Sequence, residues 1–172
     1  TSGAAWGDYN NDLYPDLYAP TYNGETDKLY INNGDGTFTK VLTGNIVTGT
    51  NFAQSSAWGD VNNDGYIDIV RGCSHSSITS ENLNDFFLNN GNGTFTPVTG
   101  ESLVTDTQPV SSVAFGDYNG DGFIDLSTVS RNGTTNKLYM NNGNSNYWLN
   151  LKMEGTVSNR DGIGAKISVK AF

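Results

Sequence analysis

The residues with the clearest chemical potential form three acidic segments of nine residues each. They are DYNNDLYPD at 8–16, DVNNDGYID at 60–68 and DYNGDGFID at 117–125. In all three, positions 1, 3, 5 and 9 are Asp, Asn, Asp and Asp. Side-chain oxygens at this spacing, together with the backbone carbonyl of position 7, can surround a hard cation such as Ca²⁺ within one tight turn. The sequence therefore predicts three Ca²⁺ sites per chain.

The predicted ligands occupy the same five positions of each segment. In chain order they are Asp8, Asn10, Asp12, Tyr14 and Asp16; Asp60, Asn62, Asp64, Tyr66 and Asp68; and Asp117, Asn119, Asp121, Phe123 and Asp125, with Tyr14, Tyr66 and Phe123 contributing backbone carbonyls. An alternative is that Asp, Asn and Gly only form turns here. A turn has no need of an Asp at position 9, so the threefold recurrence of the whole pattern favours cation binding.

These loops differ from an EF-hand, which has twelve positions, ends in a Glu and lies between two helices. Their twelfth positions are Ala19, Arg71 and Thr128, and apolar runs typical of strands follow the second and third loops. The first loop departs most from the pattern, with Leu13 where the others have Gly and with Pro15 at position 8. A left-handed backbone at position 6 would cost Leu13 about 1 kcal/mol or more, so we expect the first loop to bind its cation most weakly.

Composition excludes several classes of protein. The chain has 172 residues, enough for one domain or one domain with part of a second, and a formal charge of −9. Its nine Lys and Arg residues are scattered, whereas nucleic acid binding needs basic clusters. No apolar stretch approaches the ~18–20 residues of a membrane span. Oxygen-only calcium loops suit the millimolar Ca²⁺ outside cells, so we expect an extracellular or cell-surface protein.

Sulfur and imidazole chemistry are not expected to carry the function. Cys73 is the only cysteine and His75 the only histidine. An intrachain disulfide is therefore impossible, and a Cys/His metal site would lack about half of its ligands.

A second motif alternates with the acidic loops. LYINNGDGTF begins at Leu29, FFLNNGNGTF at Phe86 and LYMNNGNSNY at Leu138, each with the apolar run, Asn-Asn-Gly turn and aromatic-bearing run typical of a β-hairpin. Successive loops begin 52 and 57 residues apart, while the distance from hairpin aromatic to next loop is 22 both times. Length therefore varies only between a loop and its hairpin, which predicts a tolerant surface loop at 72–85.

A unit of about 50 residues with four short strands is the size of a propeller blade. In the second unit we predict strands at 55–58, 67–71, 86–89 and 94–98, and we expect no helix anywhere. The predicted fold class is all-β, with three four-stranded blades at about 1–50, 51–107 and 108–145. Three blades are fewer than the four or more that close a propeller, so we expect part of a larger propeller or one completed by an oligomer.

The two motifs in this order resemble the FG-GAP/VCBS repeat, the integrin-α-like propeller blade, over residues 1–145. The tail at 146–172 resembles the start of an ASPIC/UnbV domain, through the string NRDGIGAK at 159–166. Apolar residues alternate with polar ones at 149–154 and 163–170, which predicts a half-buried β strand pair. We therefore expect a truncated second β domain after the blades.

These features favour a non-enzymatic, calcium-stabilised module for adhesion or structural interaction. Its expected partners are a protein or carbohydrate ligand at the cell surface and copies of itself, with no nucleic acid and no membrane span. One alternative is part of a polysaccharide-acting enzyme, because some carbohydrate lyases have similar propellers, although no catalytic cluster is visible among the scattered Arg residues. Another is the subunit of an extracellular filament whose unclosed blades pack head to tail. The tyrosines and tryptophans are interpreted mainly as blade core, with a sugar-stacking surface of Tyr14, Tyr18 and Tyr22 as the alternative.

Overall fold

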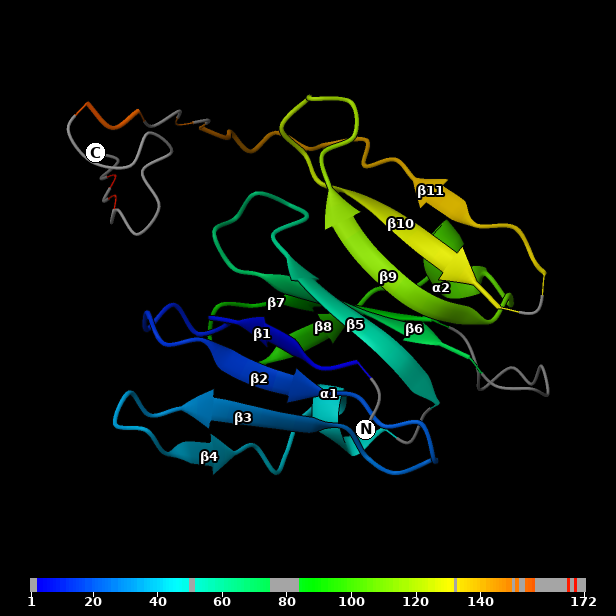
Figure 1. The fold of residues 1–172 in the computed structure, drawn as a ribbon, viewed down its shortest axis with the longest axis horizontal. Coiled ribbons are helices and arrows are strands. Elements are labelled where there is room, and N and C mark those ends of the chain that lie inside the picture. Colours follow the sequence, from blue (N-terminus) through cyan, green and yellow to red (C-terminus); the bar gives the residue numbers. More distant parts are fainter. Residues whose placement is uncertain are drawn as a thin grey trace.

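Three antiparallel sheets follow one another along the chain in the computed structural model, which describes residues 3–49, 52–74, 84–131, 133–149, 151, 154–156, 167 and 169 (Figure 1). The first sheet contains β1 (Ala5–Gly7), β2 (Asp16–Ala19), β3 (Lys28–Asn32) and β4 (Phe38–Lys40). The second contains β5 (Ala53–Gly59), β6 (Asp68–Cys73), β7 (Asp85–Asn89) and β8 (Phe95–Pro97). The third contains β9 (Val110–Gly116), β10 (Asp125–Ser130) and β11 (Lys137–Tyr139). The all-β fold class with propeller-like blades is confirmed.

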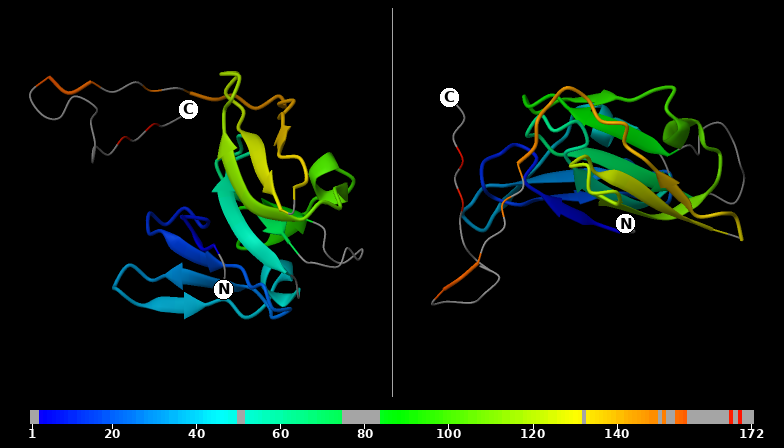
Figure 2. Two further views of the ribbon diagram at one scale, coloured as in Figure 1. Left: turned by 45° about the vertical axis from the view of Figure 1, so that its right-hand side comes forward. Right: turned by 90° about the horizontal axis from the view of Figure 1, so that it is seen from above.

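The first strands of the three sheets lie side by side, and the sheets fan out from them like blades (Figure 2). Just before β1, the backbone N–H of Gly3 donates to the carbonyl of Gln54 at 2.8 Å. The backbone N–H of Val113 in β9 donates to the Ser55 hydroxyl in β5 at 3.2 Å. Consecutive strands pair outward from this inner row, so β4 and β8 form the periphery.

The strands predicted in the second repeat are confirmed, because 55–58, 67–71, 86–89 and 94–98 lie in or overlap β5, β6, β7 and β8. The predicted surface loop is wrong at both ends. Gly72 and Cys73 continue β6 and are buried, and Asp85 begins β7. Pairing with β5 extends β6 this far, since Cys73 lies opposite Ala53. The middle of the predicted loop, 75–83 with His75, lies outside the described residues.

Two single-turn helices contradict the expectation of a helix-free chain. α1 (Asn45–Thr48) lies between β4 and β5, and α2 (Ser102–Thr105) lies between β8 and β9. Ile46 of α1 and Leu103 of α2 are buried in the hydrophobic clusters between sheets. Each 22-residue segment between a hairpin and the next loop thus contains one helical turn that places an apolar side chain in the core. Four residues are too few for a 3.6-residue periodicity to be detected in the sequence. Among the described residues, no helix is long and apolar enough to cross a membrane.

The hydrophobic core lies between the sheets. One cluster joins Tyr18 and Leu29 of the first sheet to Ile69 and Phe87 of the second. The other packs Val70, the next residue on β6, against the third sheet. Successive residues of a strand face opposite sides, so β6 is buried on both faces.

The third sheet has three strands among the described residues, one fewer than predicted. In the first two hairpins, Gly36 and Gly93 adopt φ of 89° and 83° before the outer strand. The third hairpin has Ser145 at this position. A Cβ atom costs about 1 kcal/mol in the left-handed region. Ser145 does not adopt this conformation, and residues 140–149 form no strand.

The tail beyond the third sheet is described only in part. Leu149, Leu151, Ile167 and Val169 are largely exposed, and none of them lies in a strand. The 159–166 string and most other residues of the predicted strand pair lie outside the described ranges. A truncated ASPIC/UnbV-like domain at 146–172 therefore stays a prediction.

Candidate metal centres

Each acidic segment is the loop between the first and second strands of its sheet, so the three loops lie at the same end of neighbouring blades. Position 1 shapes the turn. In the second loop, Asp60 Oδ1 accepts the backbone N–H of Asp64 at 3.0 Å, and Asp60 Oδ2 accepts that of Gly65 at 2.9 Å. The first and third loops contain the same two bonds. The position-1 carboxylate therefore holds the loop folded back toward position 5.

Positions 3 and 5 contact each other directly. Asn62 Oδ1 accepts the backbone N–H of Asp64, and Asn62 Nδ2 donates to Asp64 Oδ2, both at 2.9 Å. Asp64 Oδ1 in turn accepts the backbone N–H of Tyr66 at 2.9 Å. All three loops repeat this pattern. The structure thus brings the predicted ligands at positions 1, 3 and 5 together in every loop.

Position 7 carries an aromatic side chain that packs on the hairpin of the same blade. The ring of Tyr14 lies against Gly34, and the ring of Tyr66 lies against Gly91. The corresponding Phe123 lies beside Gly143 in the third blade. These contacts fix the part of the loop whose carbonyls are the predicted backbone ligands.

Position 9 carries a buried carboxylate, with exposed fractions of 0% for Asp16, 0% for Asp68 and 1% for Asp125. Asp68 Oδ2 accepts the backbone N–H of Val61 at 3.0 Å, and Asp68 Oδ1 accepts that of Asn89 at 2.8 Å. The same pair of bonds recurs in the other blades. Position 9 therefore links each loop to the hairpin of its own blade.

Burial makes ionisation of the position-9 carboxyl costly. It raises the pKa of Asp68 to about 7 against the opposing effect of the two backbone N–H bonds, and the charges of Asp64 and Asp60 raise it further. Burial also raises the pKa of Asp16, in a loop with the same arrangement of carboxylates. Three carboxylates thus interact unfavourably within one loop.

Position 6 adopts the left-handed backbone, which is costly for a residue with a Cβ atom. The φ angles are 75° for Leu13, 90° for Gly65 and 88° for Gly122. The Leu13 side chain is also exposed to solvent, so no burial of its own offsets the strain. The expected weakness of the first loop stays a prediction.

A family model described as FG-GAP-like repeat matches residues 8–71 and 76–128. The matched stretches include all three acidic loops and most of the chain. The chain belongs to the FG-GAP-like repeat family. FG-GAP repeats are typically extracellular or cell-surface modules with a propeller-like fold. Comparison with curated proteins found no match.

The FG-GAP loops fit a hard cation in the type and spacing of their donors. All predicted ligands are oxygen atoms, which Ca²⁺ prefers. None of the ion pairs among the described residues includes a loop carboxylate. In the same part of the chain, no three Asp, Glu, His or Cys side chains already converge on one point. The loops therefore match a cation site in donor type and local fold. Several of the donor oxygens accept hydrogen bonds from loop N–H groups.

The sequence analysis missed a buried ionic network between the first two blades. Arg71 on β6 contacts Asp27 of the first blade, and its Nη2 donates to Asp85 at 2.7 Å. Its Nη1 also donates to the Tyr18 hydroxyl oxygen at 3.1 Å, and its guanidinium lies 4.8 Å from the centre of the Phe87 ring. An Arg among the apolar residues that follow the second loop was a sign of such a network. The sequence could not identify its partner Asp27, which lies 44 residues away.

The candidate sugar-stacking surface is wrong. Tyr18 is fully buried, and its hydroxyl donates to Asp27 at 2.6 Å. Tyr22 packs edge-on against Phe52. These tyrosines therefore belong to the core and its margin.

Proposed function

We propose that this chain is a calcium-binding, non-enzymatic structural or adhesion module of a secreted or cell-surface protein. One observation carries the proposal: every loop repeats a buried position-9 carboxylate, in the first two loops the charges at positions 1 and 5 disfavour its ionisation, and no ion pair of the described residues neutralises these groups. Such a group of like charges is unfavourable at neutral pH. A divalent cation would turn it into a favourable interaction.

In this proposal, bound Ca²⁺ supplies the positive charge that three carboxylates per loop lack. The side chains at positions 1, 3, 5 and 9 and the carbonyl at position 7 hold the ion. Position 9 then transmits this restraint to the hairpin, because Asp68 also accepts the Asn89 N–H. The cation thereby fixes the first, second and third strands of a blade relative to one another.

Thermal unfolding with and without Ca²⁺ tests this function. A ligand of the native state stabilises by about 2.7 kcal/mol at a concentration 100-fold above its Kd, so the Tm should rise with calcium concentration. Asp64→Ala should remove the contribution of the second loop. Asp35→Asn is the matched control, because Asp35 is an exposed hairpin residue whose counterpart in the second blade is Asn92. An identical melting curve in excess chelator would contradict calcium binding.

A second candidate role, as a unit of a larger assembly, is favoured by an uncovered face of the first blade. Trp6 and Phe38 on this face are 60% and 45% exposed. Their counterparts in the second blade, Trp58 and Phe95, pack between blades. We propose that another blade of the same protein or of a second copy covers this face. Sedimentation over a wide concentration range tests association between copies, which a concentration-independent monomer would exclude.

A further inference from the structure

Side-chain amides connect the candidate metal loops of neighbouring blades. Asn11, at position 4 of the first loop, donates from Nδ2 to the carbonyl oxygen of Gly65, at position 6 of the second loop, at 2.9 Å. Asn63, at position 4 of the second loop, donates to the carbonyl oxygen of Gly122 in the third loop at 3.1 Å. The three loops therefore form one hydrogen-bonded row across the blades.

A second set of amides runs in the opposite direction, from each hairpin to the preceding loop. Asn89 Nδ2 donates to the carbonyl oxygen of Tyr9 in the first loop at 2.7 Å, while its backbone N–H holds Asp68 of the second loop. Asn141 repeats this arrangement at the next interface, with its Nδ2 donating to the carbonyl oxygen of Val61 at 2.7 Å. Each interface thus contains both kinds of amide bridge, and Asn144 and Asn146 add two more to the second interface by donating to the carbonyl oxygen of Asn62.

The position-4 amide acts on a peptide unit that belongs to the next site. The carbonyl oxygen of Gly65 shares its peptide bond with the N–H of Tyr66, and that N–H donates to Asp64 Oδ1 at 2.9 Å. Asn11 itself lies between the ligand positions 3 and 5 of its own loop, with a left-handed φ of 59°. Fixing the first loop therefore also fixes the amide that orients a peptide of the second.

We propose that these amides couple the three calcium sites, so that Ca²⁺ in one loop raises the affinity of the neighbouring loops. The inference rests on the proposed calcium function and specifies its regulation. Coupling between two binding sites is reciprocal, so the second loop acts equally on the first. One amide hydrogen bond corresponds to about a fivefold change in an equilibrium constant, and this is the effect expected at each interface.

Asn11→Gly removes one bridge without disturbing the backbone. The third loop already has Gly120 at position 4, with a left-handed φ of 75°. Titration with Ca²⁺, followed by NMR through the Gly65 and Gly122 amides, gives separate curves for the second and third loops. We expect Asn11→Gly to weaken binding at Gly65 about fivefold. Asn23→Gly, in the exposed turn between β2 and β3, is the matched control and should leave both curves unchanged.

A double-mutant cycle separates coupling from a local defect. Asp12→Ala disables the first loop and should weaken binding at Gly65 about fivefold in the parent chain, but should have a smaller effect in the Asn11→Gly chain, where only the Asn89 bridge remains. Asn63→Gly repeats the test at the second interface if an altered first loop fails to fold. Normal binding at Gly65 that is insensitive to both substitutions would overturn this inference alone. Absence of Ca²⁺ binding at all three loops would overturn the proposed function and this inference together.

Discussion

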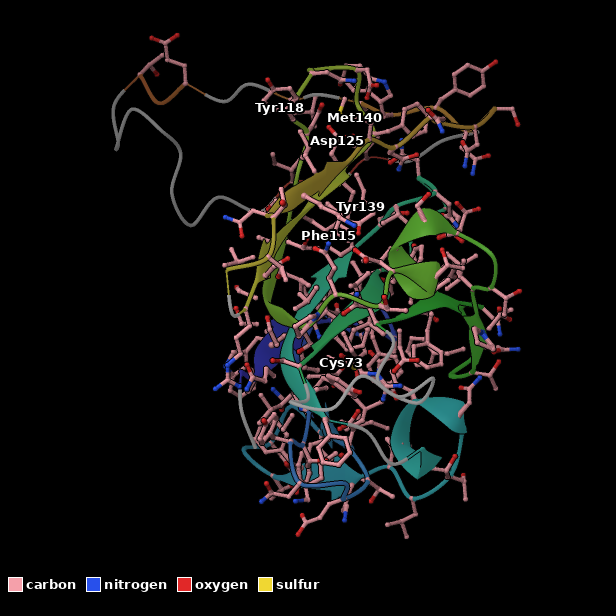
Figure 3. All side chains as sticks on the ribbon, turned by 90° about the vertical axis from the view of Figure 1, so that its right-hand side faces the viewer. Cys73, Phe115, Tyr118, Asp125, Tyr139 and Met140 are labelled. Carbon is pink, nitrogen blue, oxygen red and sulfur yellow. The ribbon has the colours of Figure 1, made fainter. Side chains whose placement is uncertain are left out.

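The two interfaces between blades arise from the same repeat but are filled differently. Between the first and second blades, the ring centre of Tyr9 lies 5.7 Å from that of Phe95 and 6.1 Å from that of Trp58. Between the second and third blades, Val61 replaces Tyr9, and the counterpart of Phe95 is Tyr147, which is 95% exposed. A pocket of about 190 Å³ remains at this second interface, with Phe115 and Tyr139 of the third sheet in its wall (Figure 3).

The polar contacts of the two interfaces differ as well. Arg71 joins the first two blades through Asp27, whereas the residue at the same position of the third blade is Thr128. The Thr128 hydroxyl is buried and has no hydrogen-bond partner among the described residues. The repeated motifs thus determine the loops and hairpins of each blade, while Arg71, which lies outside both motifs, adds a contact between blades that only the first interface has.

The largest expected effect comes from removing the ionic network of the first interface. Arg71→Thr gives the second blade the residue of the third and leaves Asp27 buried without its cation. Breaking a buried ion pair in this way costs about 3–5 kcal/mol of unfolding free energy, measurable by urea denaturation. Arg131→Thr, at an exposed position, should change stability by less than about 0.5 kcal/mol. A similar, small effect of both substitutions would show that the network contributes little.

A matched pair of aromatic truncations compares the covered and uncovered faces. Phe95→Ala should cost about 3–5 kcal/mol, because Phe95 is 6% exposed between two blades. Phe38→Ala, at the same repeat position of the first blade, should cost about 1 kcal/mol or less in the isolated chain. Urea denaturation of both variants measures the difference. A large loss for Phe38→Ala would indicate that this face is covered in solution.

The second loop borders both interfaces, and its buried Asp68 gives the calcium-free protein a characteristic pH dependence. Burial raises its pKa to about 7, against about 3.9 in an unfolded chain. Between these values the folded state keeps a proton that the unfolded state has released, so the contribution of Asp68 to stability falls as pH rises and is lost above pH 7.

Denaturation at a series of pH values in chelator measures this slope. Asp68→Asn should flatten it by an amount on the order of a few kcal/mol between pH 4 and 7, because the amide does not ionise. Under the proposed function, saturating Ca²⁺ should also flatten the slope, since a bound cation would stabilise the ionised carboxylate. Parallel profiles of the parent and Asp68→Asn chains would show that Asp68 ionises without cost.

The two interfaces also show which features of the structure can be predicted from the sequence and which cannot. Strands, hairpins and the left-handed position 6 follow from turn chemistry and alternation, which act over a few residues. The position-9 carboxylate was predicted as a ligand, but its bond to the hairpin at Asn89 depends on how the blade folds. Arg71 with Asp27 and the Asn11 bridge to Gly65 join different repeats, and no local pattern reports such distant pairs.

The smallest effect would come from making the third hairpin resemble the second. Ser145 replaces Gly93, whose φ is 83°, and Tyr147 follows Tyr139 by the same eight residues that separate Phe95 from Phe87. Ser145→Gly lets this position adopt the left-handed backbone of Gly93 without the cost of a Cβ atom, and it should add about 1 kcal/mol of stability if an outer strand then forms beside β11. That strand would direct Tyr147 toward the pocket at the second interface, so its ring should lose exposure to solvent quenchers. In the Ser145→Gly background, Tyr147→Ala should cancel the gain. Equal stability with an exposed Tyr147 would show instead that Ser145 is not what leaves the third blade one strand short.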